Sequence, residues 1–430
     1  MNGKVNLPPA QKSGLKQIFQ SLGPGLISGA ADDDPSGIAT YSQAGAQFGY
    51  SMLWTAFFTY PFMVAIQIIS ARIGRVTGKG IIANVKQFYP AWLVYLLVGL
   101  LITANTINIA ADLLAMGDAL RLVIGGSALL YGICFGLLCL CLEVFIPYRR
   151  YARILKFLTM VLFVYIITAF TVNIPWGQAL AAAVLPSFTI NSDSILLVVA
   201  IFGTTISPYL FFWQASQEVE DMYRNEEAKP LKDTPNDGSL ELSRISLDTS
   251  VGMAFSNIIA FFIILVTAST LHASGINSIQ TSAQAAEALR PLAGNLTFFL
   301  FAGGIIGTGL LAVPVLAGSA AYGAAEAVGW NATLEAKPMQ AKGFYGIVAL
   351  ATLTGIALDF TSIDPIKMLF WSAVINGFVS VPIMAIMMLV SSNPDVMGRF
   401  TLHRNLRSVG WIATLIMGFV VFSLLYYWMN

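Results

Sequence analysis

Long apolar runs separated by short polar stretches dominate the chain. A run of about 18 or more apolar residues with few charges is typical of a helix that crosses a lipid bilayer. Eleven such runs can be placed, at residues 22–46, 50–71, 92–118, 124–146, 154–174, 195–217, 248–271, 295–320, 343–361, 366–391 and 408–429. The connections are short except for residues 218–247, a charged stretch with Pro and Gly breakers. The pattern predicts an all-α membrane protein with a single transmembrane domain, in which 218–247 is a cytoplasmic loop.

The composition supports this interpretation. Hydrophobic residues make up 57% of the 430 residues and charged residues only 10%, whereas soluble domains contain about 25% charged residues. The net charge of +1 gives no reason to expect a nucleic-acid partner. We find no hydrolase, zinc-protease or nucleotide-loop motif in the sequence. We therefore expect no enzyme activity and no bound cofactor, and we expect the lipid bilayer as a partner; the oligomeric state stays open.

Basic residues predict the orientation, because cytoplasmic connections of membrane proteins are enriched in Lys and Arg. If residues 1–21 lie in the cytoplasm, 20 of the 23 Lys and Arg fall in cytoplasmic segments, and only Arg121, Arg290 and Lys367 fall outside. A wrong number of spans would destroy this alternation. We therefore predict a multi-pass protein of a bacterial inner membrane, with a cytoplasmic N-terminus and an external C-terminus.

Two spans carry a proline beside small residues at mid-membrane depth. The first contains Asp34-Pro35-Ser36-Gly37, and the sixth contains Thr204-Thr205-Ile206-Ser207-Pro208. Proline removes a backbone N–H and clashes with the preceding turn, and backbone groups freed at that depth need internal partners or a ligand. The broken spans begin two five-helix halves, 22–174 and 195–391, which the eleventh span at 408–429 follows. Matched breaks are typical of an inverted-repeat transporter with a midplane site; two simple proline kinks are the alternative.

Three consecutive acids, Asp32, Asp33 and Asp34, precede the first break. A charge at bilayer depth costs at least about 2.5–3.5 kcal/mol, and a bound cation would compensate for this cost. Successive helical residues point about 100° apart, so the three acids cannot share one site. Asp34 lies at the break and is the best candidate ligand, whereas Asp32 and Asp33 are expected to face a vestibule or polar partners.

The sixth span would supply the other side of the site. Its break exposes backbone carbonyls near Thr204 and the hydroxyls of Thr204 and Ser207. Together with Asp34 and the carbonyl of Gly37, these groups form an all-oxygen shell with one charge. Oxygen ligands suit hard cations such as Mg²⁺, Mn²⁺ and Ca²⁺. Because one carboxylate cannot neutralise a bare divalent ion, we expect the ion to keep part of its water.

Further polar residues lie within the spans, and such residues are functional candidates at this depth. Asp112 in the third span is either a proton-relay or outer-shell group, or an acid that faces a water-filled cavity. Gln214 is expected to line the inner vestibule. Asn376 in the tenth span is either a hydrogen-bonding contact or a third wall of the site.

The residues around the first break resemble the Nramp family of divalent metal transporters. The stretch DPSGIATYSQAGAQFGYSMLW is similar to the family's first-helix signature, ISARIGRVTGKG is similar to its end of span 2, and GTTISPYLFFWQAS occupies the place of its Ala-x-x-Met-Pro-His motif. The resemblance implies a leucine-transporter-like fold. It places the family's metal ligands on Asp34, Gly37, Thr204 and Ser207, its span-6 His on Tyr209 and a span-3 acid on Asp112.

This chain departs from the family pattern at several of these positions. Gly37 stands where the family has Asn, Ser207 where it has Met, Tyr209 where it has His, and Ala115 where it has a second span-3 acid. These departures resemble the family's magnesium-transporting relatives, and they imply an importer of Mg²⁺ or Mn²⁺ that works by alternating access. Two alternatives remain. One is a proton-coupled Mn²⁺/Fe²⁺ symporter with Asp34 or Asp112 as proton carrier, and the other is an organic-solute carrier of the same fold.

Overall fold

The computed structural model describes residues 23–146, 159–186, 191–224, 228–334, 336–360 and 363–429. All regular elements within these ranges are helices. Among the described residues, eight helices are long and apolar enough to cross a membrane, and two apolar helices are shorter. The first span consists of two short helices, α2 (Pro24–Asp32) and α3 (Pro35–Phe48). Together these helices account for the predicted spans and confirm the all-α fold.

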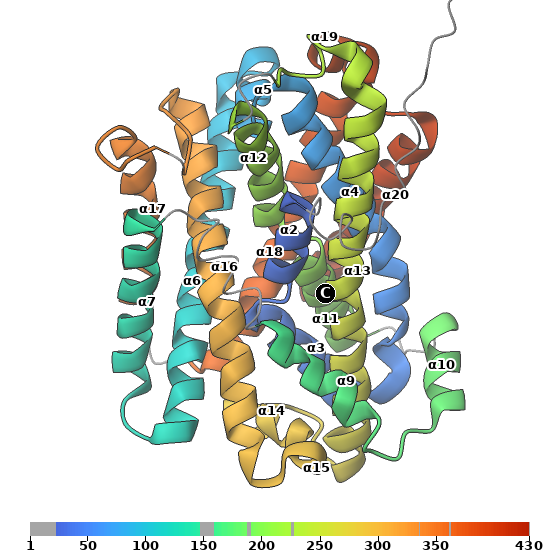
Figure 1. The fold of residues 1–430 in the computed structure, drawn as a ribbon. Helices are drawn as coiled ribbons and strands as arrows, with labels where there is room; N and C mark the ends of the chain where they lie inside the picture. The colour runs from blue at the N-terminus through green and yellow to red at the C-terminus, as the bar shows by residue number, and fades with distance from the viewer. Residues whose placement is uncertain are drawn as a thin grey trace, which may run out of the picture.

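The remaining helices follow the predicted order. The spans are α4 (Trp54–Thr77), α6 (Ala91–Ile124), α7 (Ala128–Phe145), η2 with α9 (Thr159–Leu162 and Phe163–Ala169), α11 with α12 (Ser192–Thr205 and Pro208–Arg224), α13 (Gly238–Thr270), α16 (Thr297–Val328), α17 (Lys342–Leu358), α18 (Pro365–Ser392) and α20 (Arg404–Met429). Shorter helices in the connections include α5 (Ile81–Phe88), α10 (Trp176–Val184), α14 (Ser282–Ala286), α15 (Arg290–Ala293) and α19 (Pro394–Met397). Figure 1 shows α5 and α19 at one end of the bundle and α14 and α15 at the other.

Both predicted breaks are present. Asp34 is the N-cap of α3 and Pro35 is its first residue, while α11 ends at Thr205 and Pro208 begins α12. Proline is favoured at the first position of a helix, where its missing N–H needs no partner. Prolines at 61, 314 and 382 lie inside continuous helices, so a proline alone does not decide where a span breaks.

The first span lies in the interior of the bundle (Figure 1), and α2 packs directly on α13. Glycines make this contact possible. A methyl group at Gly29 would lie 2.1 Å from the carbonyl oxygen of Gly252, and one at Gly25 would lie 2.7 Å from the amide nitrogen of Thr249. Helix α3 also packs on α13, and it contacts α18, α11 and α6. The break between α2 and α3 is therefore covered on several sides by other helices.

The predicted loop at 218–247 is wrong in its extent. Helix α12 continues to Arg224 and α13 begins at Gly238. Some of the charges that suggested a solvated loop pair with one another: Glu218 of α12 is fully buried and forms an ion pair with Arg244 of α13 at 2.5 Å. The N-terminal segment 1–21 and the basic residues between 149 and 156 lie outside the described ranges. Their predicted cytoplasmic placement therefore stays a prediction.

Candidate cation site

Asp34 has two roles: it is the N-cap of α3, and its carboxylate is the candidate negative charge of the site. Its Oδ1 accepts hydrogen bonds from Ser36 Oγ and from the backbone N–H of Gly37, both at 2.7 Å. Its Oδ2 accepts a hydrogen bond from Asn108 Nδ2 of α6 at 3.0 Å. Asp34 is only 1% exposed. An ionised carboxylate offers about four acceptor positions, so these three donors fix its orientation and leave room for a cation.

The break in the sixth span presents Thr204 and Ser207. Ser207 Oγ lies 2.8 Å from the carbonyl oxygen of Gly203 and 2.7 Å from that of Thr204, and donates to them. The Thr204 carbonyl therefore accepts one hydrogen bond and keeps one further acceptor position, and the Ser207 hydroxyl proton is used within the break. The Thr204 hydroxyl Oγ1, in contrast, is buried without a hydrogen-bond partner within the described ranges.

The two breaks meet at Gly37 and Thr204. A methyl group at Gly37 would lie 3.2 Å from Thr204 Oγ1, so the smallest residue at this position keeps the space between the breaks open. The structure therefore brings together the four predicted ligand residues. In the described part of the chain, no three acidic, His or Cys side chains converge as a metal cluster. A cation here would be held by one carboxylate and neutral oxygens.

Several buried polar atoms lie on the helices around these breaks without a hydrogen-bond partner. A buried polar group without a partner costs about 1–3 kcal/mol, and native structures contain few of them. Within the described ranges, the unpartnered atoms on α6, α11 and α18 include Thr204 Oγ1, Asn108 Oδ1, both carboxylate oxygens of Asp112, and both side-chain polar atoms of Asn376. Asn376 and Asp112 are therefore available to a cation or its water, although the structure gives neither a contact with Asp34.

Asp32 and Asp33 bond to a different helix from the one that Asp34 contacts. Ser256 of α13 bridges them, with its Oγ 2.5 Å from Asp32 Oδ2 and 2.9 Å from Asp33 Oδ1. Each acid keeps one oxygen without a partner among the residues described. The expectation that the three acids cannot share one site agrees with this arrangement, because Asp34 turns towards α6 and its neighbours turn towards α13.

Comparison with known proteins decides the family. The family described as Nramp, natural resistance-associated macrophage protein-like, matches residues 25–427. This chain belongs to the Nramp family. The expected family and the expectation of a transporter are thereby confirmed.

Curated relatives of this Nramp chain share its full extent. The divalent metal cation transporter MntH of Mycobacterium tuberculosis (strain ATCC 25618 / H37Rv) is 26% identical over 423 residues, which cover 96% of this chain and 93% of the relative. MntH of Klebsiella pneumoniae (strain 342) is 23% identical over 426 residues, which cover 95% and 94%.

Solved structures confirm the fold. The Eremococcus coleocola manganese transporter, in complex with an aromatic bis-isothiourea substituted compound, has a TM-score of 0.72 at 16% identity and covers 98% of this chain and 88% of its own. MHP1, a nucleobase-cation-symport-1 family transporter, has a TM-score of 0.58 at 12% identity and covers 94% and 92%. The predicted leucine-transporter-like architecture is therefore confirmed.

Two predicted pathway residues of this Nramp chain have structural partners. Tyr209 donates its hydroxyl to the carbonyl oxygen of Ala31 at 2.9 Å, so it occupies a backbone group that the break in the first span leaves free. Gln214 donates its side-chain amide to Thr249 Oγ1 of α13 at 2.7 Å and is fully buried. The contact between α12 and α13 encloses Gln214 in this structure, and its expected place in the inner vestibule stays a prediction.

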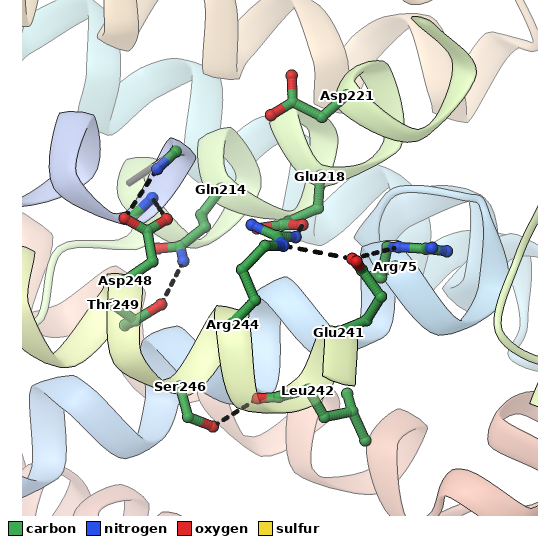
Figure 2. Close-up of polar contacts among 12 residues, drawn as sticks. Arg75, Gln214, Glu218, Asp221, Glu241, Leu242, Arg244, Ser246, Asp248 and Thr249 are labelled. Carbon is green, nitrogen blue, oxygen red and sulfur yellow. Dashed lines mark hydrogen bonds and ion pairs between the residues drawn. The ribbon is translucent and has the colours of Figure 1, made fainter. Parts of the chain in front are cut away.

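A polar network joins several helices at the predicted cytoplasmic end (Figure 2). The carboxylate of Asp248 accepts hydrogen bonds from the backbone N–H groups of Gly23, Gly25 and Leu26 at 2.9, 2.8 and 3.2 Å. Four residues earlier on α13, Arg244 pairs with Glu218 of α12 and with Glu241, and Glu241 also pairs with Arg75 of α4. Three helices and the start of α2 are thus tied together on this side of the site.

A cavity lies beside α3. This cavity of about 230 Å³ is lined by residues of α3, the starts of α11 and α18, and the segment before α14, including Ala39, Gln43, Asp193, Ile279 and Lys367. Gln43 Oε1 accepts a hydrogen bond from the backbone N–H of Ile279 at 2.9 Å. Ala39 and Gln43 place one wall of this cavity on α3, the helix that Asp34 caps.

The sequence interpretation missed three residues that carry this arrangement. They are Asn108, which bonds to Asp34, Ser256, which bonds to Asp32 and Asp33, and Asp248, which bonds to the start of α2. Asn108 had a signal in the sequence, because it lies four residues before Asp112 and therefore on the same helical face. Ser256 and Asp248 had none, because their partners lie more than 200 positions away.

Proposed function

We propose that this Nramp protein moves a divalent metal cation across the membrane by alternating access, and that the cation binds at Asp34 between the two breaks. The observation that carries the proposal is the geometry of Asp34. It is a fully buried carboxylate without a basic partner in the described structure, beside Gly37 and the unpartnered hydroxyl of Thr204. The names of the curated relatives, divalent metal cation transporters, support the same cargo. The organic-solute alternative finds no support in these relatives.

The ligand chemistry favours Mg²⁺ or Mn²⁺ as cargo. The groups at the breaks are a carboxylate, hydroxyls and carbonyls, and oxygen ligands suit hard cations. Ser207 and Tyr209 stand where the family resemblance places a thioether and an imidazole, so the site offers nothing that prefers a soft metal. One carboxylate cannot balance two positive charges, and the cation would therefore enter with part of its hydration shell.

The proposed direction of transport is inward, with the N-terminus in the cytoplasm of a bacterial cell and the C-terminus outside. An inside-negative membrane potential contributes about 2.3 kcal/mol per charge per 100 mV, and therefore about 4.6 kcal/mol for a divalent ion. This driving force suffices for uptake without a second ion. In the proposed cycle, the cavity above α3 admits the cation, and the network around Asp248 opens to release it.

Uptake into proteoliposomes tests the proposal. Wild-type protein should carry Mg²⁺ or Mn²⁺ into vesicles that contain a metal-sensitive dye, and Asp34→Asn should abolish this uptake. Asp233→Asn is the matched control, because Asp233 is exposed in the connection between α12 and α13, and it should transport like the wild type. Uptake of neither ion by the wild type would refute the function, whereas full activity of Asp34→Asn would refute the site.

A proton-coupled symporter is the second candidate, and Asp112 is the observation that favours it. This acid is fully buried, and neither of its carboxylate oxygens has a hydrogen-bond partner among the described residues. The same vesicles with an internal pH dye separate the two modes. Acidification that follows metal influx and disappears in Asp112→Asn would establish symport, and metal influx without acidification would establish uniport.

A further inference from the structure

Asn108 of α6 occupies an unusual position beside the proposed ligand. Its side chain is fully buried, and its Nδ2 donates a hydrogen bond to Asp34 Oδ2 at 3.0 Å. A carboxylate can only accept, so the amide nitrogen must face Asp34 and the assignment of the two amide atoms is fixed by chemistry. The amide oxygen Oδ1 belongs to the same planar group and has no hydrogen-bond partner within the described ranges.

This contact is the tie between Asp34 and the helices outside its own span. The other two donors to Asp34, Ser36 Oγ and the Gly37 N–H, belong to the first turn of α3 and hold only Oδ1. Helix α6 packs against α16, α7 and α17. Asn108 therefore sets the direction of Oδ2 relative to a part of the bundle that does not contain the break.

The unpartnered oxygen of Asn108 lies on the same face of α6 as other unpartnered oxygens. Asp112 lies one turn further along α6, and both of its oxygens lack a partner among the described residues. Residues four apart on a helix are neighbours on its surface. These oxygens are hydrogen-bond acceptors. A buried acceptor needs either a hydrogen-bond donor or a positive ion as its partner. Water bound to a cation supplies such a donor, and a charged group strengthens that hydrogen bond.

We propose that Asn108 is a positioning and selectivity residue of the cation site: its amide N–H fixes Asp34, and its amide oxygen accepts a hydrogen bond from water that the cation carries. The inference rests on the proposed function and deepens it, because it names the cargo as a small, partly hydrated divalent cation. Mg²⁺ gives up its water reluctantly and usually keeps several water molecules when bound. A site that contacts this water through Asn108 therefore favours Mg²⁺ over an ion of the same charge that exchanges water for direct ligands more readily, such as Mn²⁺.

Calorimetric titration of the purified protein with MgCl₂ and with MnCl₂ tests the inference. In Asn108→Leu, which keeps the approximate size but removes both polar atoms, Mg²⁺ binding should weaken by about 10- to 100-fold, the usual effect of losing a group that orients a metal ligand. Mn²⁺ binding should weaken less, so that the ratio of the two dissociation constants changes by roughly threefold or more. Equal weakening for both ions would overturn the selectivity role, and unchanged binding would overturn the whole inference.

Asn105→Leu is the matched control. Asn105 lies one turn earlier on α6, is equally buried, and donates to the carbonyl oxygen of Leu316 instead of Asp34. The ratio of dissociation constants should stay at the wild-type value in this variant. A change as large as that in Asn108→Leu would overturn the inference, because the effect would then come from loosening α6.

Asn108→Asp gives a second, nearly isosteric test if the leucine variant fails to fold. It has two carboxylate oxygens where Asn108 has one amide oxygen, and it loses the N–H that holds Asp34. The ratio of the two dissociation constants should shift in favour of Mn²⁺, because a second carboxylate takes the place of water that Mg²⁺ gives up reluctantly. An unchanged ratio, or a ratio that shifts in favour of Mg²⁺, would overturn the inference. A wild-type protein that binds Mn²⁺ but not Mg²⁺ would refute the inference and leave the proposed function intact, whereas binding of neither ion would refute the proposed function.

Discussion

Removing the carboxylate of Asp248 should loosen the start of α2 from α13. Asp248 accepts hydrogen bonds from three backbone N–H groups at the beginning of α2, those of Gly23, Gly25 and Leu26. N–H groups in the first turn of a helix have no partner within that helix, and Gly23, the N-cap, has no side chain to serve them. A residue more than 220 positions away in the sequence therefore caps this half-helix (Figure 2).

The size of the effect follows from these contacts. Loss of a side-chain N-cap costs about 0.5–2 kcal/mol, and loss of a negative charge at a helix N-terminus costs about 0.3–1 kcal/mol. If α2 moves away from α13, water can replace Asp248, so the carboxylate stabilises the closed arrangement relative to the open one. In Asp248→Ala we expect the closed arrangement to lose about 1–2 kcal/mol, which is a factor of about 5 to 30 in the equilibrium between the two.

Hydrogen–deuterium exchange measures this equilibrium directly. Peptides that cover residues 24–32 should exchange about 5- to 30-fold faster in Asp248→Ala than in the wild type, and peptides from α16 should keep their rates. Asp237→Ala is the matched control, because Asp237 lies at the start of the same helix and its side chain makes no capping hydrogen bond. Its α2 peptides should exchange like those of the wild type.

Two results would refute this reasoning. Unchanged exchange in α2 would mean that the glycine contacts with α13 alone hold the half-helix. A similar acceleration in every helix would mean that Asp248 stabilises the whole fold and not the closure at the predicted cytoplasmic end.

Three further perturbations test the packing and the ion pairs. Gly29→Ala should lower the melting temperature in detergent by the equivalent of about 1–3 kcal/mol, because the new methyl group would lie 2.1 Å from the Gly252 carbonyl oxygen. Gly99→Ala on α6, with no atom within 4 Å of the added methyl group, should instead stabilise the protein by about 0.4–1 kcal/mol in the same measurement. Arg244→Gln should destabilise the protein by about 3–5 kcal/mol, because it leaves the buried Glu218 without its cation. The double variant Glu218→Gln with Arg244→Gln should recover most of this loss in a thermal melt. No recovery would show that the broken ion pair is not the cause.

The sequence predicted the breaks well because their signal is local. Asp34-Pro35 and Ser207-Pro208 each place a short polar residue before a proline, and this pair starts a new helix wherever the preceding span can stop. The same local reasoning separated Asp34 from Asp32 and Asp33, since the angle between successive helical residues does not depend on tertiary structure. Four proposed ligand residues could thus be named without knowing how the helices pack.

The partners of these residues could not be predicted in the same way. The charges in 218–247 suggested solvent exposure, but Glu218 is buried because Arg244 reaches it from the next helix. The ends of α12 and α13 therefore extend past the apolar runs that defined the spans. Composition cannot distinguish a charge in water from a charge that is neutralised by another element, and only the packed arrangement does so.

The break in the first span lies between the proposed cation site and the contacts that Asp248 makes with the start of α2. Asp33 and Asp34 separate α2 from α3, so these helices are joined by only a short non-helical link. On one side of this link, Asp32 and Asp33 contact Ser256 of α13, and on the other side Asp34 contacts Asn108 of α6. A cation that pulls on Asp34 therefore acts on the same backbone that holds α2 against α13. Any change in the direction of the Asp34 carboxylate must be absorbed by the link or passed to α2, and the proposed cation would thereby act on the contacts between α2 and Asp248.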